Sequence, residues 1–311
     1  EARAGKQVAV VVSAMAGETD RLLGAAEALG GGLGELETDT VLAAGEQASA
    51  ALMALALKRE GFASEAVMGW SLPILVEGPP GSAKITDIHG EQLDAMMSAG
   101  VIPVVAGYQG LNAEGRLATL GRGGTDLSAA AVAAAVGAEC DIYTDVDGVY
   151  TTDPRIVTKA RKLERISHEE MLELASLGAK VLQTRSVEMA MNHGVRLQVL
   201  SSFEDLPGTL VVDEDEIVEQ QVVSGIAYSR DEAKITLVQV ADKPGVAAAI
   251  FGPLADASVN VDMIVQSVSH DGKRTDLTFT VGKADLERAV EVLKSNHDEI
   301  EYTDLLADAD V

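Results

Sequence analysis

Positive charge is scarce in this sequence. Lysine and arginine together number 24, against 49 aspartate and glutamate residues, so the 311 residues carry a formal net charge of −25 at pH 7. A surface this acidic repels phosphate backbones and anionic lipid. Nucleic acids and membranes are therefore excluded as main partners, while a local basic site for a small anion is still allowed. The acidic excess fits a high-salt source and an ordinary acidic enzyme about equally well.

Cysteine and long apolar runs are scarce as well. The one cysteine, Cys140, excludes an internal disulfide and is typical of a protein in a reducing cytoplasm. No apolar run reaches the ~18 residues of a membrane-spanning helix. The first apolar run, residues 8–12, is too short for the core of a signal peptide. We therefore expect a soluble cytoplasmic protein.

Apolar residues make up 47% of the chain, enough for a sizeable core, and the length suits two domains. Strands and helices alternate over the first two thirds, which predicts an α/β domain with a mainly parallel sheet sandwiched by helices. After an acidic run at 213–216 the order changes to a ferredoxin-like βαββαβ pattern. We expect the first domain over 1–215 and the second over 216–311.

Glycines, prolines and capping residues delimit the expected elements. Thr19 or Asp20 would cap the first helix, Ser167 with Glu170 forms a capping box, and Pro253 would kink a later helix. The expected helices are 19–29, 45–59, 91–99, 127–136, 167–177, 185–192, 244–257 and 284–293. The expected strands are 8–12, 66–70, 101–106, 141–144, 195–200, 234–240, 259–265 and 274–281, with a turn at 271–272.

The segment 120–126, Leu-Gly-Arg-Gly-Gly-Thr-Asp, leads into an alanine-rich helix. Its glycines let backbone N–H groups approach an anion, and the helix N-terminus adds partial positive charge. Arg122 can bind a carboxylate or phosphate through two parallel hydrogen bonds. Asp126 suits Mg²⁺ or the orientation of reacting groups, but it could equally be a simple helix cap.

A second polar segment, residues 143–155, follows a predicted strand, where open α/β sheets bind ligands. It is not a calcium loop, because Tyr150 and Ile156 stand where glycine and glutamate are required. Residues 110–116 have the spacing of a Walker A loop but not its Lys-Ser/Thr. Cys140 is more simply a packing residue than a nucleophile. The five histidines lack metal-ligand spacing, so no residue is assigned to a metal.

Together these motifs resemble, in kind and order, those of the aspartate kinases. In the first domain they are Ser13-Ala14-Met15, Gly45-Glu46, Gly107-Tyr108-Gln109-Gly110, Gly121-Arg122-Gly123-Gly124-Thr125-Asp126, the segment from Thr144 to Arg155, and Gly178-Ala179-Lys180-Val181-Leu182. In the second domain Asp242-Lys243-Pro244-Gly245 and the segment from Asn260 to Gln266 resemble the first ACT regulatory module of that family. The resemblance implies an amino acid kinase fold over 1–215 and an ACT domain over 216–311.

The resemblance also implies phosphoryl transfer from ATP, with Mg²⁺, to the side-chain carboxylate of L-aspartate. This is the first step of lysine, threonine and methionine biosynthesis. The implied catalytic residues are Asp126, Arg122 and Lys180. The implied aspartate-binding residues are Ser13, Thr19, Glu46, Arg122, Gly123, Gly124 and Thr125, with Arg122 on a carboxylate and Glu46 on the ammonium. The implied ATP-binding residues are Thr144, Asp145, Tyr150, Thr151, Thr152, Asp153, Pro154, Arg155 and Lys180.

Feedback by lysine, threonine or both is implied for the ACT domain, and pairing of ACT domains implies a homo-oligomer. The implied effector-binding residues are Asp242, Ala247, Asn260, Val261, Asp262 and Gln266. The family begins with a strand and a Lys-Phe/Tyr-Gly-Gly segment and usually ends with a second ACT module. We expect the natural product to carry the first of these segments ahead of this sequence, and the ACT module to pair with another chain or with residues beyond this sequence. The alternatives are a catalytically inactive amino-acid sensor and another kinase of the fold, such as a glutamate or acetylglutamate kinase.

Overall fold

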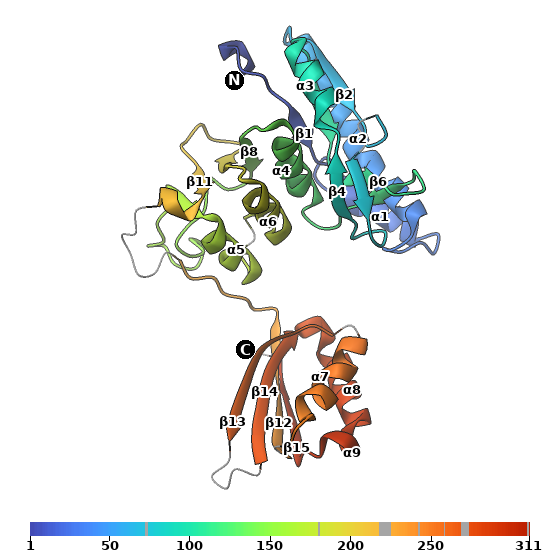
Figure 1. The fold of residues 1–311 in the computed structure, drawn as a ribbon, viewed down its shortest axis with the longest axis vertical. Helices are drawn as coiled ribbons and strands as arrows, with labels where there is room; N and C mark the ends of the chain where they lie inside the picture. The colour runs from blue at the N-terminus through green and yellow to red at the C-terminus, as the bar shows by residue number, and fades with distance from the viewer. Residues whose placement is uncertain are drawn as a thin grey trace. The chain divides into compact units, whose positions relative to one another are not determined.

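The structure is a computed structural model that describes residues 1–71, 74–179, 181–217, 225–241, 243–257, 259–268, 274–309 and 311. The chain forms two compact units, Glu1–Ala227 and Tyr228–Val311, which are described separately (Figure 1). The first unit runs past residue 215, where the sequence analysis places the domain boundary. Lys180, Asp242 and the turn expected at 271–272 lie outside the described residues.

Three parallel strands form the first sheet, in the order β1-β5-β2. The elements are β1 (Val10–Val12), β5 (Ile102–Ala106), β2 (Ser64–Val67), α2 (Leu36–Arg59) and α3 (Gly90–Ser98). Val104 and Ala106 of β5 pack with alanines of α2, whereas Val105 packs with Leu93 and Met97 of α3. The β-branched runs of the sequence therefore form strands covered on both faces, as predicted.

Two predicted helix starts are wrong. Helix α1 (Glu18–Glu27) has Gly17 at its N-cap, so Thr19 and Asp20 lie in its first turn and do not cap it. Helix α2 begins at Leu36, well before the expected start at Gly45. Gly45 instead permits a close contact inside the helix, because a Cβ there would lie 2.9 Å from the Cβ of Ala14.

Helix α2 has the length and the apolar composition that a membrane span requires, with 33% of its apolar window buried. No other helix in the described part of the chain meets both criteria. Its Ala50 and Ala54 belong to the same apolar cluster as Val104 and Ala106 of the first sheet. In this unit α2 is thus a core helix that covers one face of the sheet.

A second sheet of short strands, in the order β4-β3-β6-β7, is absent from the sequence prediction. Its strands are β3 (Ile74–Glu77), β4 (Lys84–Ile88), β6 (Gln109–Leu111) and β7 (Leu117–Thr119). The pairs β3/β4 and β6/β7 are antiparallel. Strands of three to five residues are too short for alternation to stand out. The sheet matters here because β7 leads directly into the glycine segment.

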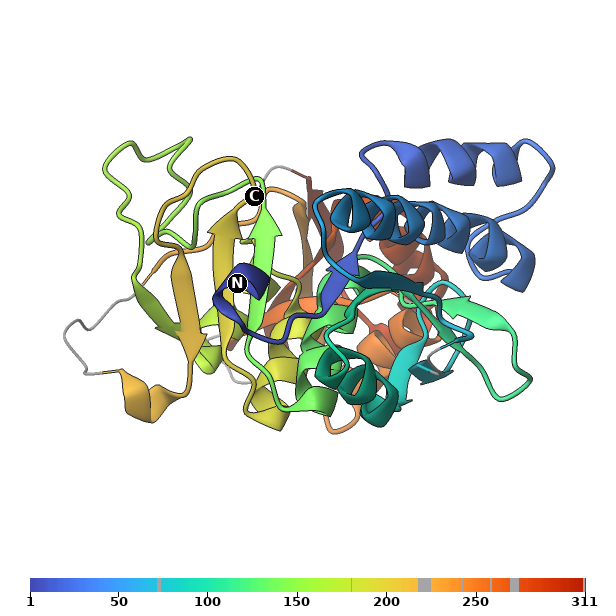
Figure 2. The same cartoon turned by 90° about the horizontal axis from the view of Figure 1, so that it is seen from above.

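The remainder of the first unit is a four-stranded sheet in the order β8-β10-β11-β9, packed against helices. Ser167 forms the predicted capping box with Glu170 at the start of α5. Strands β9 and β11 were not predicted. The N-terminal segment passes from the side of β8 to β1 (Figure 2). The elements are η1 (Ala2–Ala4), α4 (Gly124–Val136), β8 (Cys140–Thr144), β9 (Arg165–Ser167), α5 (His168–Ser176), α6 (Thr184–His193), β10 (Leu197–Ser201), β11 (Thr209–Val212) and η2 (Glu214–Glu216).

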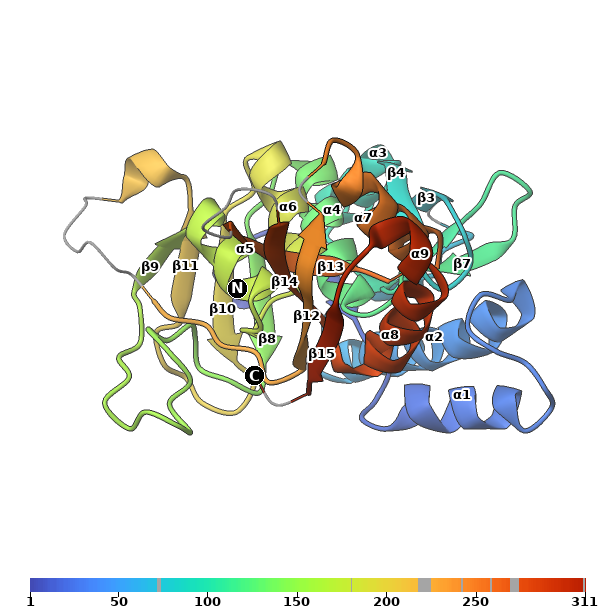
Figure 3. The ribbon, with the colours of Figure 1, turned by 90° about the horizontal axis from the view of Figure 1, so that it is seen from below.

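The second unit has the predicted βαββαβ order, with an antiparallel sheet ordered β13-β14-β12-β15. Its helices lie on one face of the sheet (Figures 1 and 3), where Ile250, Phe279 and Leu293 are fully buried. Pro253 lies inside α7, which begins after Pro244. The elements are β12 (Glu232–Ala241), α7 (Val246–Asp256), β13 (Val261–Val268), β14 (Arg274–Gly282), η3 (Lys283–Asp285), α8 (Leu286–Ser295), α9 (His297–Ile300) and β15 (Asp304–Asp308).

A fully buried carboxylate on α2 fixes the strand that precedes the glycine segment. Asp39 Oδ2 accepts hydrogen bonds from the backbone N–H groups of Thr119, at 2.7 Å, and Gly81, at 3.0 Å. Its Oδ1 accepts a hydrogen bond from Thr119 Oγ1 at 2.9 Å. A buried charge is tolerated only when it is hydrogen-bonded in this way. Asp39 therefore ties α2, β7 and the turn at Gly81 together.

We predict that Asp39→Asn lowers the free energy of unfolding by roughly 1–3 kcal/mol, because the amide has no charge to strengthen these hydrogen bonds and has an NH₂ donor in place of one of the two accepting oxygens. Chemical denaturation of the mutant and the wild type measures the difference. Asp20→Asn, which changes an exposed residue of α1, is the matched control and should leave stability within about 0.5 kcal/mol. Equal stability of the Asp39 mutant and the control would contradict this account.

Candidate functional site

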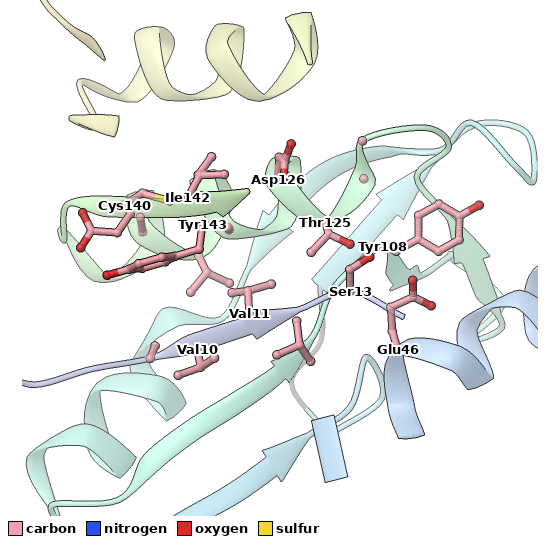
Figure 4. A pocket seen from close by; sticks show the side chains of 18 of the residues that line it. Val10, Val11, Ser13, Glu46, Tyr108, Thr125, Asp126, Cys140, Ile142 and Tyr143 are labelled. Atoms are coloured by element: carbon pink, nitrogen blue, oxygen red, sulfur yellow. The ribbon is translucent and has the colours of Figure 1, made fainter. Parts of the chain in front are cut away.

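A cavity of about 1110 Å³ lies in the first unit between β1 and β8. The start of α4, Glu46 of α2 and Tyr108 close one end of it (Figure 4). Its residues come from both halves of the unit, since β1 and β8 belong to different sheets. A ligand in this cavity would therefore contact several elements at once, which is typical of an active site.

The predicted aspartate-binding residues all line this cavity. Ser13 lies just after β1, Thr19 is on α1, and the rest follow on α2 and around the start of α4. Figure 4 shows Ser13, Thr125 and Glu46 around one end, with Tyr108 beside them. The residues brought together are Ser13, Thr19, Glu46, Arg122, Gly123, Gly124, Thr125 and Asp126.

The glycine loop, residues 120–124, is shaped by contacts that exclude side chains. A Cβ on Gly121 would lie 2.7 Å from the carbonyl oxygen of Gly81, and one on Gly123 would overlap the side chain of Gln183. Both glycines have a positive φ, 78° and 71° respectively, which other residues rarely adopt. Helix α4 begins at Gly124, so its first free N–H groups lie at the end of this loop.

Arg122 lies at the middle of the glycine loop with its side chain exposed. Within the described residues its guanidinium has no ion-pair partner, although the chain carries 49 acidic residues. An unpaired guanidinium beside a helix N-terminus is suited to a carboxylate or a phosphate.

Glu46 is a buried carboxylate with one unsatisfied oxygen. Its Oε1 accepts a hydrogen bond from Ala14 N–H at 3.1 Å, whereas its Oε2 has no partner among the described residues. Burial raises the pKa of this carboxyl group. Gly45, the neighbouring residue, allows Ala14 to approach closely enough for that hydrogen bond. A ligand ammonium would offset the cost of the unpaired oxygen.

Asp126 lies in the first turn of α4 and lines the same cavity. The helix has Gly123 at its N-cap and no side-chain capping hydrogen bond, so the capping alternative is wrong. Burial raises the pKa of Asp126, and no cation pairs with it in the described part of the chain. The carboxylate is therefore free to act on a cation or on reacting groups.

Of the predicted ATP-binding residues, Thr144 ends β8 and the other described ones follow on the next loop; none of these lines the cavity of Figure 4. Thr144 Oγ1 donates to Asp145, and Arg155 forms an ion pair of 2.8 Å with Asp153. The structure thus places Thr144, Asp145, Tyr150, Thr151, Thr152, Asp153, Pro154 and Arg155 near one another along this loop. Lys180 lies outside the described residues.

Several residues at or near the site were given no role from the sequence. Tyr108 lines the cavity with a φ of 67°, an uncommon value for a residue other than glycine. Asp147 accepts hydrogen bonds from Tyr150 and Lys162, and Lys162 also donates to the carbonyl oxygen of Pro207. Tyr108 and Asp147 lie in motifs named above, but their contacts join segments that are distant in the sequence, so the motifs alone gave them no role. Cys140 is buried in the apolar cluster of this half, as a packing residue would be, and burial raises its pKa to about 12.

We predict that Asp126→Asn stabilises the fold at neutral pH by about 1 kcal/mol, the usual scale for relieving strain at a functional site. Burial places the folded-state pKa above the ordinary 3.8, so the wild type loses stability as pH rises from 3.8 through the raised pKa. The asparagine does not titrate, so the difference should vanish below pH 3.8. Denaturation of both proteins across pH, with exposed Asp94→Asn as control, checks this; a pH-independent difference would refute it.

A model of the amino acid kinase family matches residues 1–201, and a model of the ACT domain matches residues 234–298. An aspartate kinase from Pseudomonas fluorescens is 47% identical to the chain over 312 residues. That match covers 99% of this chain and 75% of the relative.

Solved structures of aspartokinases are also similar to this chain. The Escherichia coli aspartokinase III complex with aspartate and ADP has a TM-score of 0.75 at 26% identity, covering 93% of this chain and 65% of that protein. The complex of the same enzyme with lysine and aspartate has a TM-score of 0.69 at 27% identity, covering 88% and 61%. The chain therefore spans somewhat less than two thirds of this solved relative.

Proposed function

Because this chain belongs to the aspartate kinase family, with both its kinase and its ACT regulatory parts, we propose that it phosphorylates L-aspartate. The γ-phosphoryl group of ATP would pass to the side-chain carboxylate and yield 4-phospho-L-aspartate. The observation that carries this proposal is that one cavity is lined both by a Glu46 oxygen and by an Arg122 guanidinium that have no partner among the described residues.

The chemistry of the cavity matches the charges of the substrate. L-Aspartate has one ammonium and two carboxylates. Glu46 would bind the ammonium, Arg122 would bind a carboxylate, and Ser13 and Thr125 would donate neutral hydrogen bonds beside them. A substrate held at several points lies in a fixed position, which is the main requirement of phosphoryl transfer.

The N-terminus of α4 would supply charge stabilisation for the reaction. Its free N–H groups and partial positive charge lie next to Asp126 and Thr125, at the end of the cavity. Asp126 would orient the reacting groups, and Lys180 would act as a cation near the phosphates. The loop from Thr144 to Arg155 would bind the nucleotide.

Mg²⁺ would neutralise charge on the phosphates of ATP. Among the described residues no cluster of three potential ligands forms a metal site. Asp126 alone fits the way proteins bind Mg²⁺ with nucleotides, where one or two carboxylates suffice because phosphates and waters complete the coordination. The donor set is therefore compatible with a cation that arrives with ATP.

The ACT unit would bind an inhibitory amino acid, lysine or threonine or both. E. coli aspartokinase III was solved with lysine. In this unit Glu232 has a buried Oε2 without a hydrogen-bond partner among the described residues. Burial, and then the nearby carboxylate of Asp262, raise the pKa of Glu232. Two neighbouring carboxylates attract an ammonium group, which supports an effector site that includes Asp262.

The other predicted effector residues lie around the same strand. Ala247 is on α7, and Asn260, Val261 and Gln266 lie at or on β13. Strand β13 is an edge strand, with the side chains of Met263, Ile264 and Val265 at least half exposed. An exposed apolar edge of this kind favours pairing between ACT units, and hence a homo-oligomer. We assign the protein to the cytoplasm and to lysine, threonine and methionine biosynthesis.

The direct test is to supply L-aspartate, ATP and Mg²⁺ and to trap the acyl phosphate with hydroxylamine. Formation of aspartyl hydroxamate supports the proposal. Calorimetric binding of an amino-acid effector without any binding of L-aspartate or ATP would instead identify a non-catalytic sensor. Turnover of glutamate or acetylglutamate in place of L-aspartate would identify another kinase of the fold.

We predict that Arg122→Lys weakens L-aspartate binding about tenfold to a hundredfold and changes ATP binding little, because lysine cannot form two parallel hydrogen bonds with a carboxylate. The KM or Kd of each substrate measures the effect. Arg116→Lys is the matched control, since Arg116 is an exposed residue paired with Glu37 at 2.8 Å. Equal weakening for both substrates would remove Arg122 from the aspartate site.

We predict that Asp262→Ala retains activity but raises the inhibitory concentration of the effector about fivefold or more, the lower range of allosteric coupling. Inhibition curves with lysine and with threonine measure the shift. Glu287→Ala on α8 removes an equivalent exposed charge and should leave inhibition unchanged. Unchanged inhibition in the Asp262 mutant would exclude this residue from the effector site.

A further inference from the structure

Arg185 connects the two halves of the catalytic unit at the glycine loop. It lies on α6, which packs with the sheet that contains β8. Its Nη1 donates to the carbonyl oxygen of Leu120 at 2.5 Å, and its Nη2 donates to that of Ala83 at 2.7 Å. Both acceptors belong to the other half, next to β7 and β4. One side chain therefore joins three segments that are distant in the sequence.

The two acceptors are themselves neighbours in a fixed backbone arrangement. Ala83 N–H donates to the carbonyl oxygen of Thr119 at 3.0 Å, and Leu120 N–H donates to that of Tyr108 at 2.9 Å. Asp39 accepts a hydrogen bond from the backbone N–H of Thr119. The strand that enters the glycine loop is thus held by α2 through Asp39 and by α6 through Arg185.

The start of α6 also contacts the far end of the glycine loop. Gly123 lies directly against Gln183, the N-cap of α6, so closely that a Cβ would overlap that side chain. Leu120 thus accepts a hydrogen bond from Arg185, and Gly123 packs against Gln183. Arg122 therefore lies between two loop residues that contact the start of α6. A displacement of α6 would change the position from which Arg122 reaches the cavity.

We propose that Arg185 is a positioning residue for L-aspartate. It holds the glycine loop so that Arg122 presents its guanidinium to the substrate carboxylate. The expected effect of Arg185 on L-aspartate affinity rests on the function proposed above, whereas its expected effect on the position of the loop does not. A planar guanidinium with two donors spans two carbonyl groups at once, and a lysine ammonium on its flexible stem does not reproduce that fork.

The experiment compares Arg185→Lys and Arg185→Ala with the wild type. Arg196→Lys is the matched control, because Arg196 is a surface residue of the same half whose guanidinium pairs with Glu216 at 2.7 Å. Hydrogen–deuterium exchange is followed in peptides covering residues 119–127, where the amides of Thr119, Leu120, Gly124 and Leu127 are hydrogen-bonded. The affinities for L-aspartate and for ATP are measured on the same proteins.

The proposal predicts faster exchange in this segment for both Arg185 mutants and wild-type exchange for the control. It predicts about tenfold weaker L-aspartate binding in Arg185→Lys, with ATP binding changed less than about twofold. Added guanidinium ion should partly restore L-aspartate binding to Arg185→Ala, and methylammonium should not. A purely structural role would lower the melting temperature and weaken both ligands alike.

Unchanged exchange in the loop of the Arg185→Lys protein would overturn the proposal, as would equal losses for L-aspartate and ATP. If Arg185→Ala does not fold, Arg185→Lys still decides the question. If the wild type binds no L-aspartate, the proposed function fails, but the exchange measurement still shows whether Arg185 holds the loop.

Discussion

The catalytic unit depends on a loop that has no room for a side chain at Gly121 or Gly123. Gly121 lies against the carbonyl oxygen of Gly81, and Gly123 lies against Gln183, so α4 and its preceding strand approach their neighbours at van der Waals distance. Asp39 and Arg185 hold the backbone that leads into this loop, through Thr119 and Leu120. The position of Arg122, and of the free N–H groups of α4, follows from that packing. Larger residues at the two glycines would displace both.

Electrostatics explains why a strongly acidic protein can bind a dicarboxylic substrate. The net charge of −25 repels anions at long range, but salt screens exposed charges beyond about 10 Å. Within the cavity the local charges are different, with an unpaired Arg122 and the positive end of α4 beside Glu46 and Asp126. Burial raises the pKa of both carboxyl groups, so each favours a nearby cation. The site thus contains complementary partners for an amino acid with one ammonium and two carboxylates.

The sequence predicted the elements with strong local signals. The buried strands β1 and β5, the capping box at Ser167 and the βαββαβ order of the second unit all follow from periodicity and capping chemistry. The start of α2 was not predictable, because a glycine such as Gly45 is typical of a helix terminus. Its place inside the helix is explained only by the close contact with Ala14, which the sequence does not reveal. The grouping of the predicted aspartate-binding residues around one cavity could be anticipated through family motifs, whereas Asp39 and Arg185 act through long-range contacts and lie in none of the motifs named above.

The central claim is that Glu46 and Arg122 together recognise a zwitterionic dicarboxylate. Calorimetry with L-aspartate and with succinate, which has the carboxylates but no ammonium, tests it on the wild type and on Glu46→Gln. The account predicts that the wild type prefers L-aspartate by about tenfold or more, because succinate leaves the Glu46 oxygen unpaired, and that Glu46→Gln loses this preference. Equal affinity of the wild type for both ligands, or an undiminished preference in Glu46→Gln, would contradict it.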